Sequence, residues 1–305
     1  MTDYVREYFD SRASAWLQQA YLQDPLPAKY RIGDERVRVT IEGVAGAVPA
    51  GGSLVDLGCG GGQLCLHASR LGWKVTGIDV AEAMIEEARR LCAGTDVGLL
   101  VAAYDDNGLP GDAFDAVTAL GLIEYLPHDD GLLREGSRLL RSGGRFAVSC
   151  RNRLYNVSSL NDYTLAEADR GAVGDLAGEL ATTLRGTDRE ALSRLAASLA
   201  EAATELEEAM RLDESTPPPD LLDHPTAFVQ ERRQHTPAGI AAAAEGAGLR
   251  LVGIKALHPH PLPAAVEPVA PRFYNRLALA FQRPLEDSPL GLATASSYVA
   301  VFEKV

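Results

Sequence analysis

The order of apolar and polar positions divides the chain into three parts. Over residues 1–50 apolar side chains recur at helical spacing, as at Tyr4, Tyr8 and Trp16, and a second helix is predicted over residues 34–48. From there to residue 152, short apolar runs alternate with amphipathic stretches. This alternation predicts strands joined by helices, and so a mostly parallel sheet with helices on both faces. The strands are expected within residues 53–58, 74–80, 97–104, 114–126 (with an exit loop) and 145–152.

Strand patterns are missing from residues 153–230. Two segments there, residues 175–184 and 189–212, are rich in Ala, Leu and Glu at helical period, and a run of prolines follows them. We expect these segments to form an inserted helical cap. A helix that opens with Thr236, and then a strand, follow the cap. The predicted parts are N-terminal helices over residues 1–50, a core over 51–152 and 231–305, and the cap over 153–230.

Net charge and composition narrow the range of partners. The 305 residues carry a formal net charge of −13, which argues against nucleic acid and anionic membranes. No apolar run approaches ~18 residues, and the N-terminal residues lack the apolar core of a signal peptide. The four cysteines have neither zinc-site spacing nor the pattern of a disulfide framework. We expect a cytoplasmic monomer or homodimer that acts on a small molecule.

A dense glycine run lies between the first predicted strand and the next helix, in the sequence VDLGCGGGQL of residues 55–64. Glycine is needed where φ is positive or where a ligand contacts bare backbone. Gly58, Gly60 and Gly62 therefore indicate a loop that binds a nucleotide-like ligand at the carboxyl edge of the sheet. Asp79 ends the second strand, where a carboxylate accepts hydrogen bonds from ribose hydroxyls of either NAD or S-adenosylmethionine.

Two further acidic positions favour S-adenosylmethionine over a dinucleotide. Asp56 precedes the first glycine by two residues, where it would repel a pyrophosphate but suit a cationic amino group and a sulfonium. Asp105 follows the third strand and would accept a hydrogen bond from an adenine amino group, while the backbone N–H of Asp106 would reach a ring nitrogen. A dinucleotide-dependent oxidoreductase and a non-catalytic cofactor-binding protein stay open as alternatives.

Together these motifs resemble a class I S-adenosylmethionine-dependent methyltransferase over residues 54–151. The resemblance rests on VDLGCGGG, GIDVAEAMIEEAR, DDNGLP, FDAV and LLRSGGRFAVS. It implies a Rossmann-like, mostly parallel seven-stranded sheet that binds the methyl donor at the glycine loop. The cofactor-binding residues that it implies are Asp56, Gly58, Cys59, Gly60, Gly62, Asp79, Val80, Met84, Asp105, Asp106 and Leu120.

The N-terminal helices resemble those of small-molecule methyltransferases, such as the ubiquinone O-methyltransferase and magnesium-protoporphyrin methyltransferase groups. This resemblance implies that they close over the cofactor, with Arg31 near the methionine carboxylate and Tyr21 lining the pocket. Residues 120–124 would form the floor near the transferred methyl group.

Candidates for a catalytic base follow two of the strands. His258 and His260 lie in HPHPLP after the sixth strand, and a histidine suits a hydroxyl acceptor. The alternative is a proline-stiffened loop with both histidines in solvent. A metal site is not expected, because this H-x-H pair lacks a third ligand. Glu124 follows the fourth strand and would orient cofactor or substrate, or else is an ordinary helix-start carboxylate.

Polar residues at the strand exits are candidates for substrate contact. Arg151 and Arg153 follow the fifth strand and would clamp a carboxylate or a phosphate. The alternative is a solvated strand exit with surface salt bridges. Further substrate-binding candidates are Asn152, Tyr155 and Tyr125.

The leading hypothesis is therefore a transferase that methylates a small polar or anionic metabolite, foremost at oxygen, with specialised biosynthesis as its expected setting. N- and C-methylation stay open. His224 and His235, at the borders of the cap, are expected at the surface rather than in a site.

Overall fold

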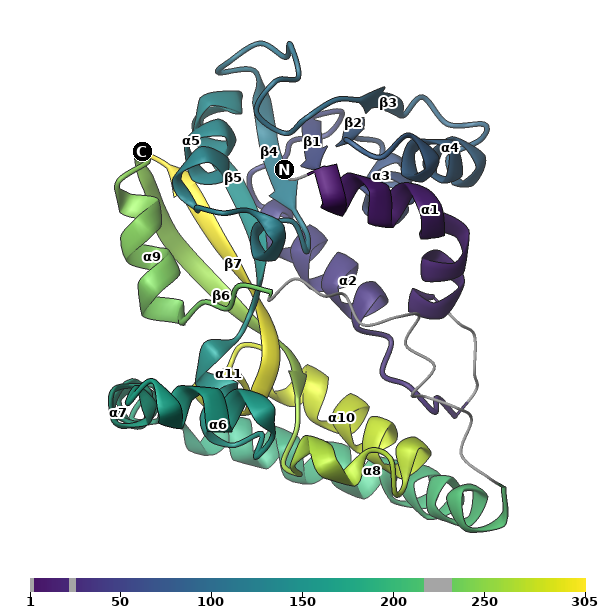
Figure 1. Cartoon of the computed structure of the whole chain (residues 1–305), viewed down its shortest axis with the longest axis vertical. Coiled ribbons are helices and arrows are strands. Elements are labelled where there is room, and N and C mark those ends of the chain that lie inside the picture. The colour runs from purple at the N-terminus through teal and green to yellow at the C-terminus, as the bar shows by residue number, and fades with distance from the viewer. Residues whose placement is uncertain (1–2, 22–25, 217–231) are drawn as a thin grey trace.

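A computed structural model of the chain describes residues 3–21, 26–216 and 232–305. Its strands form one seven-stranded sheet in the order β3-β2-β1-β4-β5-β7-β6 (Figure 1). Strands β1 to β5 pair in parallel, and β7 is antiparallel to both β5 and β6. The predicted fold class is confirmed. The strands are β1 (Ser53–Leu57), β2 (Lys74–Asp79), β3 (Gly98–Val101), β4 (Phe114–Ala119), β5 (Leu140–Arg151), β6 (Leu249–Pro259) and β7 (Ala295–Lys304).

Two apolar cores cover the two faces of the sheet, because successive strand residues point to opposite faces. Leu54 packs with α2 (Ile32–Ala45), α3 (Gln63–Arg70) and α4 (Glu82–Leu91) on one face. Val55 packs with α5 (Asp130–Leu139) and α9 (Pro237–Glu245) on the other. Winding reverses between β1 and β4, and in such sheets ligands bind at the carboxyl ends of the strands beside this point.

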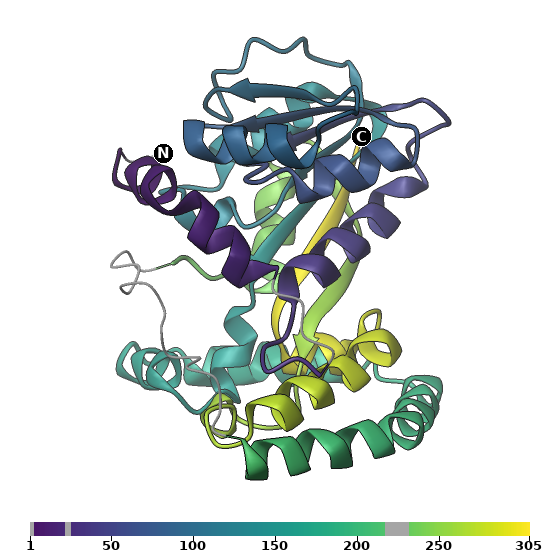
Figure 2. The ribbon, with the colours of Figure 1, turned by 90° about the vertical axis from the view of Figure 1, so that its right-hand side faces the viewer.

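The first helix lies over the carboxyl edge rather than on either sheet face. Helix α1 (Asp3–Ala20) lies beside α4 (Figure 2). A small apolar cluster joins the two helices. The carboxylate of Asp10 also accepts a hydrogen bond from the backbone N–H of Ala83. The predicted N-terminal helices are confirmed. The cluster consists of Ala13, Ala81 and Met84, with Phe9, Trp16, Leu17 and Ala83 packed against it.

The cap helices gather at the end of the molecule to which β5, β6 and β7 extend (Figures 1 and 2). After β5 the chain forms η2 (Arg153–Val157), α6 (Asp162–Asp169), α7 (Val173–Leu184) and α8 (Arg189–Ser215). The helical character of this segment was predicted from its periodicity, although α6 was not.

Two helices missing from the sequence analysis also lie in the cap layer. Helix α10 (Pro271–Leu285) packs along α8, and α11 (Pro289–Thr294) packs on α7. Helix α10 was not predicted because its segment contains prolines, which usually interrupt a helix. Pro271 is tolerated because it lies in the first turn, where no backbone N–H donor is required. A short 3-10 turn, η3 (Ala264–Val266), precedes α10. The predicted boundary between core and cap stays a prediction.

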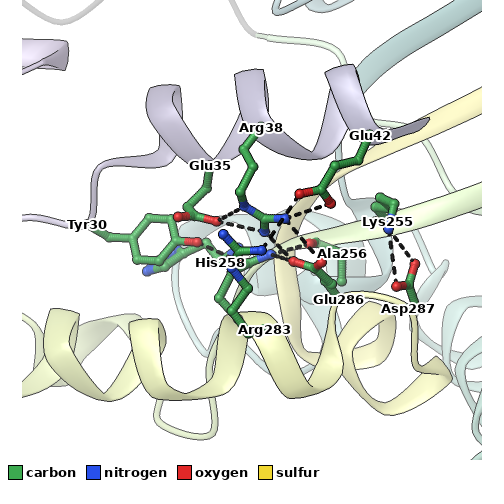
Figure 3. Close-up of polar contacts among 11 residues, drawn as sticks. Tyr30, Glu35, Arg38, Glu42, Lys255, Ala256, His258, Arg283, Glu286 and Asp287 are labelled. Carbon is green, nitrogen blue, oxygen red and sulfur yellow. Dashed lines mark hydrogen bonds and ion pairs between the residues drawn. The ribbon is translucent and has the colours of Figure 1, made fainter. Parts of the chain in front are cut away.

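An ion-pair network joins α2 of the core to α10 of the cap layer (Figure 3). The guanidinium of Arg38 donates hydrogen bonds to Glu35 and Glu42 on its own helix and to Glu286 at the end of α10. The Glu286 carbonyl accepts a hydrogen bond from the N–H of Ala256 on β6, at 2.7 Å. Three elements therefore meet at Glu286: α2 contacts its carboxylate, and β6 contacts its backbone carbonyl.

Candidate active site

The glycine loop between β1 and α3 is open on one side and covered on the other. Gly58, Gly60 and Gly62 have φ values of 72°, 50° and 82°, which only glycine adopts readily. A Cβ on Gly60 would meet no atom of the described residues within 4 Å. On Gly61 it would lie 2.6 Å from the side chain of Leu17 on α1. The loop therefore exposes backbone to a ligand beneath the cover of α1.

Asp79 at the end of β2 holds this loop in place. One carboxylate oxygen accepts a hydrogen bond from the N–H of Gly60, and the other accepts one from the N–H of Ala81, each at 2.9 Å. Burial raises the pKa of Asp79, while these backbone hydrogen bonds lower it, and the net shift is upward. Val80 beside it is half-buried. Each carboxylate oxygen keeps lone-pair capacity for a further donor, such as a ribose hydroxyl.

Asp56 lies beneath the loop with its carboxylate engaged inside the protein. It is 2% exposed and accepts a hydrogen bond from the hydroxyl of Thr118 on β4 at 2.7 Å. The thiol of Cys65 on α3 lies 3.8 Å from its second oxygen. Burial raises the pKa of Asp56 to about 7. Cys59 is also buried and contributes to packing around the loop.

The predicted adenine-binding residues differ in their surroundings. Met84 is buried under α1, whereas Asp105 is exposed. The N–H of Asp106 already donates to the carbonyl of Ala103 at 3.3 Å. An adenine nitrogen would have to share this donor. The roles of all three residues stay predictions.

At the start of α2 the structure adds a residue that the sequence analysis missed. Arg31 pairs with Asp34, one turn along the helix. Arg36 instead reaches the carboxyl edge of the sheet, where its Nη1 lies next to Gly121, just after β4. A Cβ built on Gly121 would be 2.8 Å from this nitrogen. The Nε atoms of Arg31 and Arg36 are buried without a hydrogen-bond partner among the described residues. No local motif marks Arg36, so only packing reveals it.

Tyr21, the predicted pocket residue, lies against the start of the same helix. A Cβ on Gly33 would lie 2.9 Å from its ring. Burial raises the pKa of Tyr21 to about 12, so the phenol is neutral at physiological pH. Its predicted contact with the cofactor stays a prediction.

The exit of β4 borders the glycine loop. Leu122 would lie 3.4 Å from a Cβ on Gly58, and the half-buried Leu120 packs against the core. In η1 (Ile123–Tyr125), the carboxylate of Glu124 lies 3.9 Å from Nε of Arg151. The ring of Tyr125 meets the ring of Phe9 on α1 edge-on, with the centroids 5.7 Å apart. This exit therefore links the loop, α1 and the end of β5.

His258 is half-buried and packs against an aromatic ring rather than lying free in solvent, so the structure contradicts the solvent alternative. It is on β6 with a φ of 57°, and its ring centroid lies 4.5 Å from that of Tyr30 (Figure 3). Its Nδ1 lies 3.1 Å from Oγ of Ser296, and its Nε2 is buried without a partner among the described residues. Burial lowers the pKa of His258 to about 3, so it is a weak base at neutral pH.

His260 is buried, with both ring nitrogens engaged. Its Nδ1 accepts a hydrogen bond from the N–H of Leu262 at 3.0 Å. Its Nε2 therefore carries the proton and donates to the carbonyl of Tyr274 at 2.8 Å. The rings of His260 and Tyr274 are stacked 3.6 Å apart. Tyr155, a predicted substrate residue, is half-buried and hydrogen-bonded to Tyr274.

Asn152 after β5 uses its amide inside the protein. It is 1% exposed, and its Nδ2 donates to the carbonyls of Leu292 and Ala295 at 2.8 and 2.9 Å. Its Oδ1 accepts a hydrogen bond from the N–H of Leu154. These contacts account for Asn152 as a structural residue, and they leave its predicted substrate contact without support.

The expectation that His235 lies at the surface is wrong. Its backbone extends β5 by pairing with Asn152, and the side chain is 7% exposed. Its Nε2 lies 2.9 Å from Oδ1 of Asp129. Burial raises the pKa of Asp129, but hydrogen bonds from His235 and Arg233 outweigh this effect and lower it to about 2. His224 lies outside the described residues.

Over the described ranges, no group of three His, Cys, Asp or Glu side chains is arranged to hold a metal ion. All four cysteines are buried and free. Within the same ranges, none of the helices combines the length and the apolar character needed to cross a membrane.

Comparison with known proteins identifies the class of this domain. Residues 55–148 match the family model of the methyltransferase domain. Together with the strand order and the glycine loop, this match identifies that segment as a class I S-adenosylmethionine-dependent methyltransferase domain.

Particular relatives are similar over different extents. The ubiquinone biosynthesis O-methyltransferase of Xanthomonas axonopodis pv. citri (strain 306) is 34% identical over 148 residues, which are 48% of this chain and 59% of that protein. The match thus spans little more than half of such curated relatives.

Two solved structures share the fold over nearly the whole chain. One is the putative methyltransferase in complex with the Haloferax volcanii Trm112 methyltransferase activator, with a TM-score of 0.55, 18% identity and 97% coverage of both chains. The other is the magnesium protoporphyrin IX methyltransferase of Synechocystis PCC 6803 with bound SAH. Its TM-score is 0.55 at 15% identity, covering 99% of this chain and 98% of that one.

Proposed function

We propose that this chain transfers a methyl group from S-adenosylmethionine to an oxygen of a small molecule. The observation that carries the proposal is the open glycine loop held by Asp79 within the matched methyltransferase domain. The similarity to a ubiquinone biosynthesis O-methyltransferase supports oxygen as the acceptor atom. The net charge of −13 supports a small molecule rather than a nucleic acid.

The residues at the carboxyl edge fit this cofactor. The backbone of Gly58–Gly62 would bind the methionine part, and Asp79 would accept hydrogen bonds from the ribose hydroxyls. The buried Nε of Arg36 lacks a partner among the described residues, which suits it to the methionine carboxylate. When bound, S-adenosylmethionine supplies an electrophilic methyl group and a good thioether leaving group.

The chain itself contributes positioning and exclusion of water. Leu17 on α1 covers the glycine loop, and Phe9 on α1 covers the β4 exit. Tyr125, which contacts Phe9, would line the part of the site that holds the acceptor. Glu124 is the remaining candidate base, because it belongs to η1 at the β4 exit, where Leu122 approaches Gly58. His258 and His260 are packed instead among buried aromatic rings.

Calorimetric titration with S-adenosylmethionine, S-adenosylhomocysteine and NADH tests the cofactor. We expect both sulfur nucleosides to bind, NADH not to bind, and Asp79→Ala to weaken binding at least about tenfold, since it removes charge-assisted hydrogen bonds. Asp96→Ala, at an exposed aspartate, is the matched control. Melting temperatures separate lost binding from lost folding. Binding of NADH alone would instead support the oxidoreductase alternative.

A further inference from the structure

A pocket of about 320 Å³ opens beside the end of β5, where the sheet domain meets the cap. Arginines dominate its wall, although the chain as a whole is acidic, with a net charge of −13. The lining residues are Arg153, Glu167, Arg170, Arg232, Arg233 and Gln234.

One buried and one half-buried carboxylate hold two of these arginines from the protein side. Arg153 donates to both oxygens of Glu167, at 2.8 and 2.6 Å, and Arg233 donates to Asp129 at 2.6 Å. The side chains of Glu167 and Asp129 are 2% and 18% exposed, whereas those of Arg153 and Arg233 are 35% and 34% exposed. The carboxylates thus fix the guanidinium groups while leaving them accessible at the pocket.

These ion pairs do not use all the donors of the two guanidinium groups. Arg153 engages its Nε and Nη2, and Arg233 engages only Nη1, which also donates to the carbonyl of Leu126. The Nη1 of Arg153 and the Nε and Nη2 of Arg233 have no partner among the described residues. Because a guanidinium nitrogen only donates, the complementary ligand is an anion with several acceptor oxygens.

The pocket borders the proposed methyl-transfer site. The guanidinium carbon of Arg232 lies 5.8 Å from the ring centroid of Tyr125. Tyr125 in turn meets Phe9 of α1 and belongs to the β4 exit, where Leu122 approaches Gly58. One aromatic side chain therefore separates the arginine pocket from the cover of the glycine loop.

We propose that this pocket binds the phosphate or carboxylate group of the acceptor molecule, and that it thereby selects anionic acceptors. The proposal rests on the proposed methyltransferase function for the identity of the ligand as an acceptor. Several preorganised arginine donors suit an oxyanion with two or three terminal oxygens, and prior fixation by Glu167 and Asp129 reduces the entropy lost on binding.

Calorimetry with the S-adenosylhomocysteine complex tests the proposal. The probes are phenyl phosphate, inorganic phosphate and benzoate, and the variants are Arg170→Gln and Arg170→Gln/Arg233→Gln, the second of which removes the unpaired donors of Arg233. The matched control is Arg134→Gln, at an exposed arginine on α5. We expect phenyl phosphate or benzoate to bind, the double variant to bind at least about tenfold more weakly, and the control to bind unchanged. Binding of S-adenosylhomocysteine should stay the same in every variant.

Three results would overturn the proposal: equal oxyanion affinity in wild type and double variant, competition between the oxyanion and S-adenosylhomocysteine, or binding of inorganic phosphate alone. The last would assign the pocket to a free ion, since an acceptor group must tolerate an organic substituent. Should the double variant fail to fold, Arg170→Gln alone decides, because Arg170 is exposed at the end of α6. Oxyanion binding without any S-adenosylhomocysteine binding would refute the proposed function and leave the anion site intact.

Discussion

At the scale of single residues, the hydrogen-bond partners of a carboxylate that is at least partly buried decide its charge. The carboxylate of Asp56 has one hydroxyl and one thiol as hydrogen-bond donors. Burial outweighs these two contacts and raises the pKa of Asp56 to about 7. Asp129 accepts hydrogen bonds from His235 and Arg233. These hydrogen bonds lower its pKa to about 2, although partial burial acts in the opposite direction. The carboxyl of Asp56 under the glycine loop therefore titrates close to neutral pH, whereas that of Asp129 beside the arginine pocket is ionised there.

The raised pKa of Asp56 predicts a pH-dependent stability. The folded pKa of about 7 exceeds the ordinary value of 3.8, so this contribution is present below pH about 4 and is lost as the pH rises through 7. Asp56→Asn removes it. We expect the variant to gain stability relative to wild type, by up to about 1.4 kcal/mol for each pH unit in that window. Urea unfolding at pH 5 and pH 8 measures the gain, with Asp96→Asn as control, and an equal difference at both pH values would contradict the assignment.

Arg36 predicts a selective loss of cofactor affinity. We expect Arg36→Gln to weaken S-adenosylhomocysteine at least about tenfold, because one charge-assisted pair to the carboxylate is lost. Methylthioadenosine lacks that carboxylate and should bind equally to both proteins. Arg89→Gln, at an exposed arginine on α4, is the matched control.

Arg31→Gln separates the two candidates for this carboxylate. If only Arg31→Gln weakened S-adenosylhomocysteine binding and Arg36→Gln bound like wild type, Arg31 would be the partner of the methionine carboxylate, as the sequence predicts. Equal weakening of methylthioadenosine by Arg36→Gln would show that the arginine supports the fold of the site rather than the ligand.

At the scale of elements, the loop and its flanking helices depend on close contact as well as on backbone conformation. Gly62 begins α3 with a φ of 82°, and a Cβ there would lie 3.0 Å from the Cβ of Ala88 on α4. Gly72 has a similar φ of 79° and faces no atom of the described residues within 4 Å. Both positions therefore require a left-handed backbone conformation, but a side chain would meet a neighbouring helix only at Gly62.

This pair predicts two different costs of alanine substitution. Gly72→Ala should destabilise the fold by about 1 kcal/mol, the cost of a left-handed residue. Gly62→Ala should cost more, about 2 to 3 kcal/mol, because the new Cβ also crowds α4. Chemical denaturation measures both. Equal costs would mean that α4 moves aside freely.

Element prediction from the sequence succeeded where the signal is local. Alternating apolar runs and glycine stops predicted β1, β2, α3 and α4, since periodicity and turn residues act over a few positions. Helices α6 and α10 escaped prediction for different reasons: α6 is short, and α10 is bounded and interrupted by proline. Packing on α8 stabilises α10 where local propensity does not.

At the scale of the whole molecule, one arginine connects the sheet domain to the cap layer. Arg38 is 17% exposed and Glu286 is 8% exposed, so their ion pair is largely removed from solvent. Arg283 on the same face of α10 is 63% exposed and lies 3.7 Å from Glu42. Each arginine forms an ion pair between α2 and α10. The pair of Arg38 is largely buried, and the pair of Arg283 is exposed to solvent.

Removal of each arginine should therefore have a different effect. Arg38→Met leaves Glu286 buried without its main partner, and we expect a loss of about 3 kcal/mol in unfolding free energy. Arg283→Met removes a solvent-screened pair and should cost less than about 0.5 kcal/mol. Urea unfolding of both variants provides the measurement. A cost for Arg38→Met as small as that for Arg283→Met would show that water reaches Glu286.

The amino-acid sequence was sufficient to predict the alternating sheet domain, the glycine loop and Asp79 as the strand-end acid. These features depend on periodicity, backbone conformation and short spacing, all of which are local. Long-range packing sets the contact of His258 with Tyr30 and the approach of Arg36 to the carboxyl edge. Only the packed chain brings together the pocket arginines of η2, of the end of α6 and of residues 232–233, because burial and neighbourhood depend on which distant elements pack together.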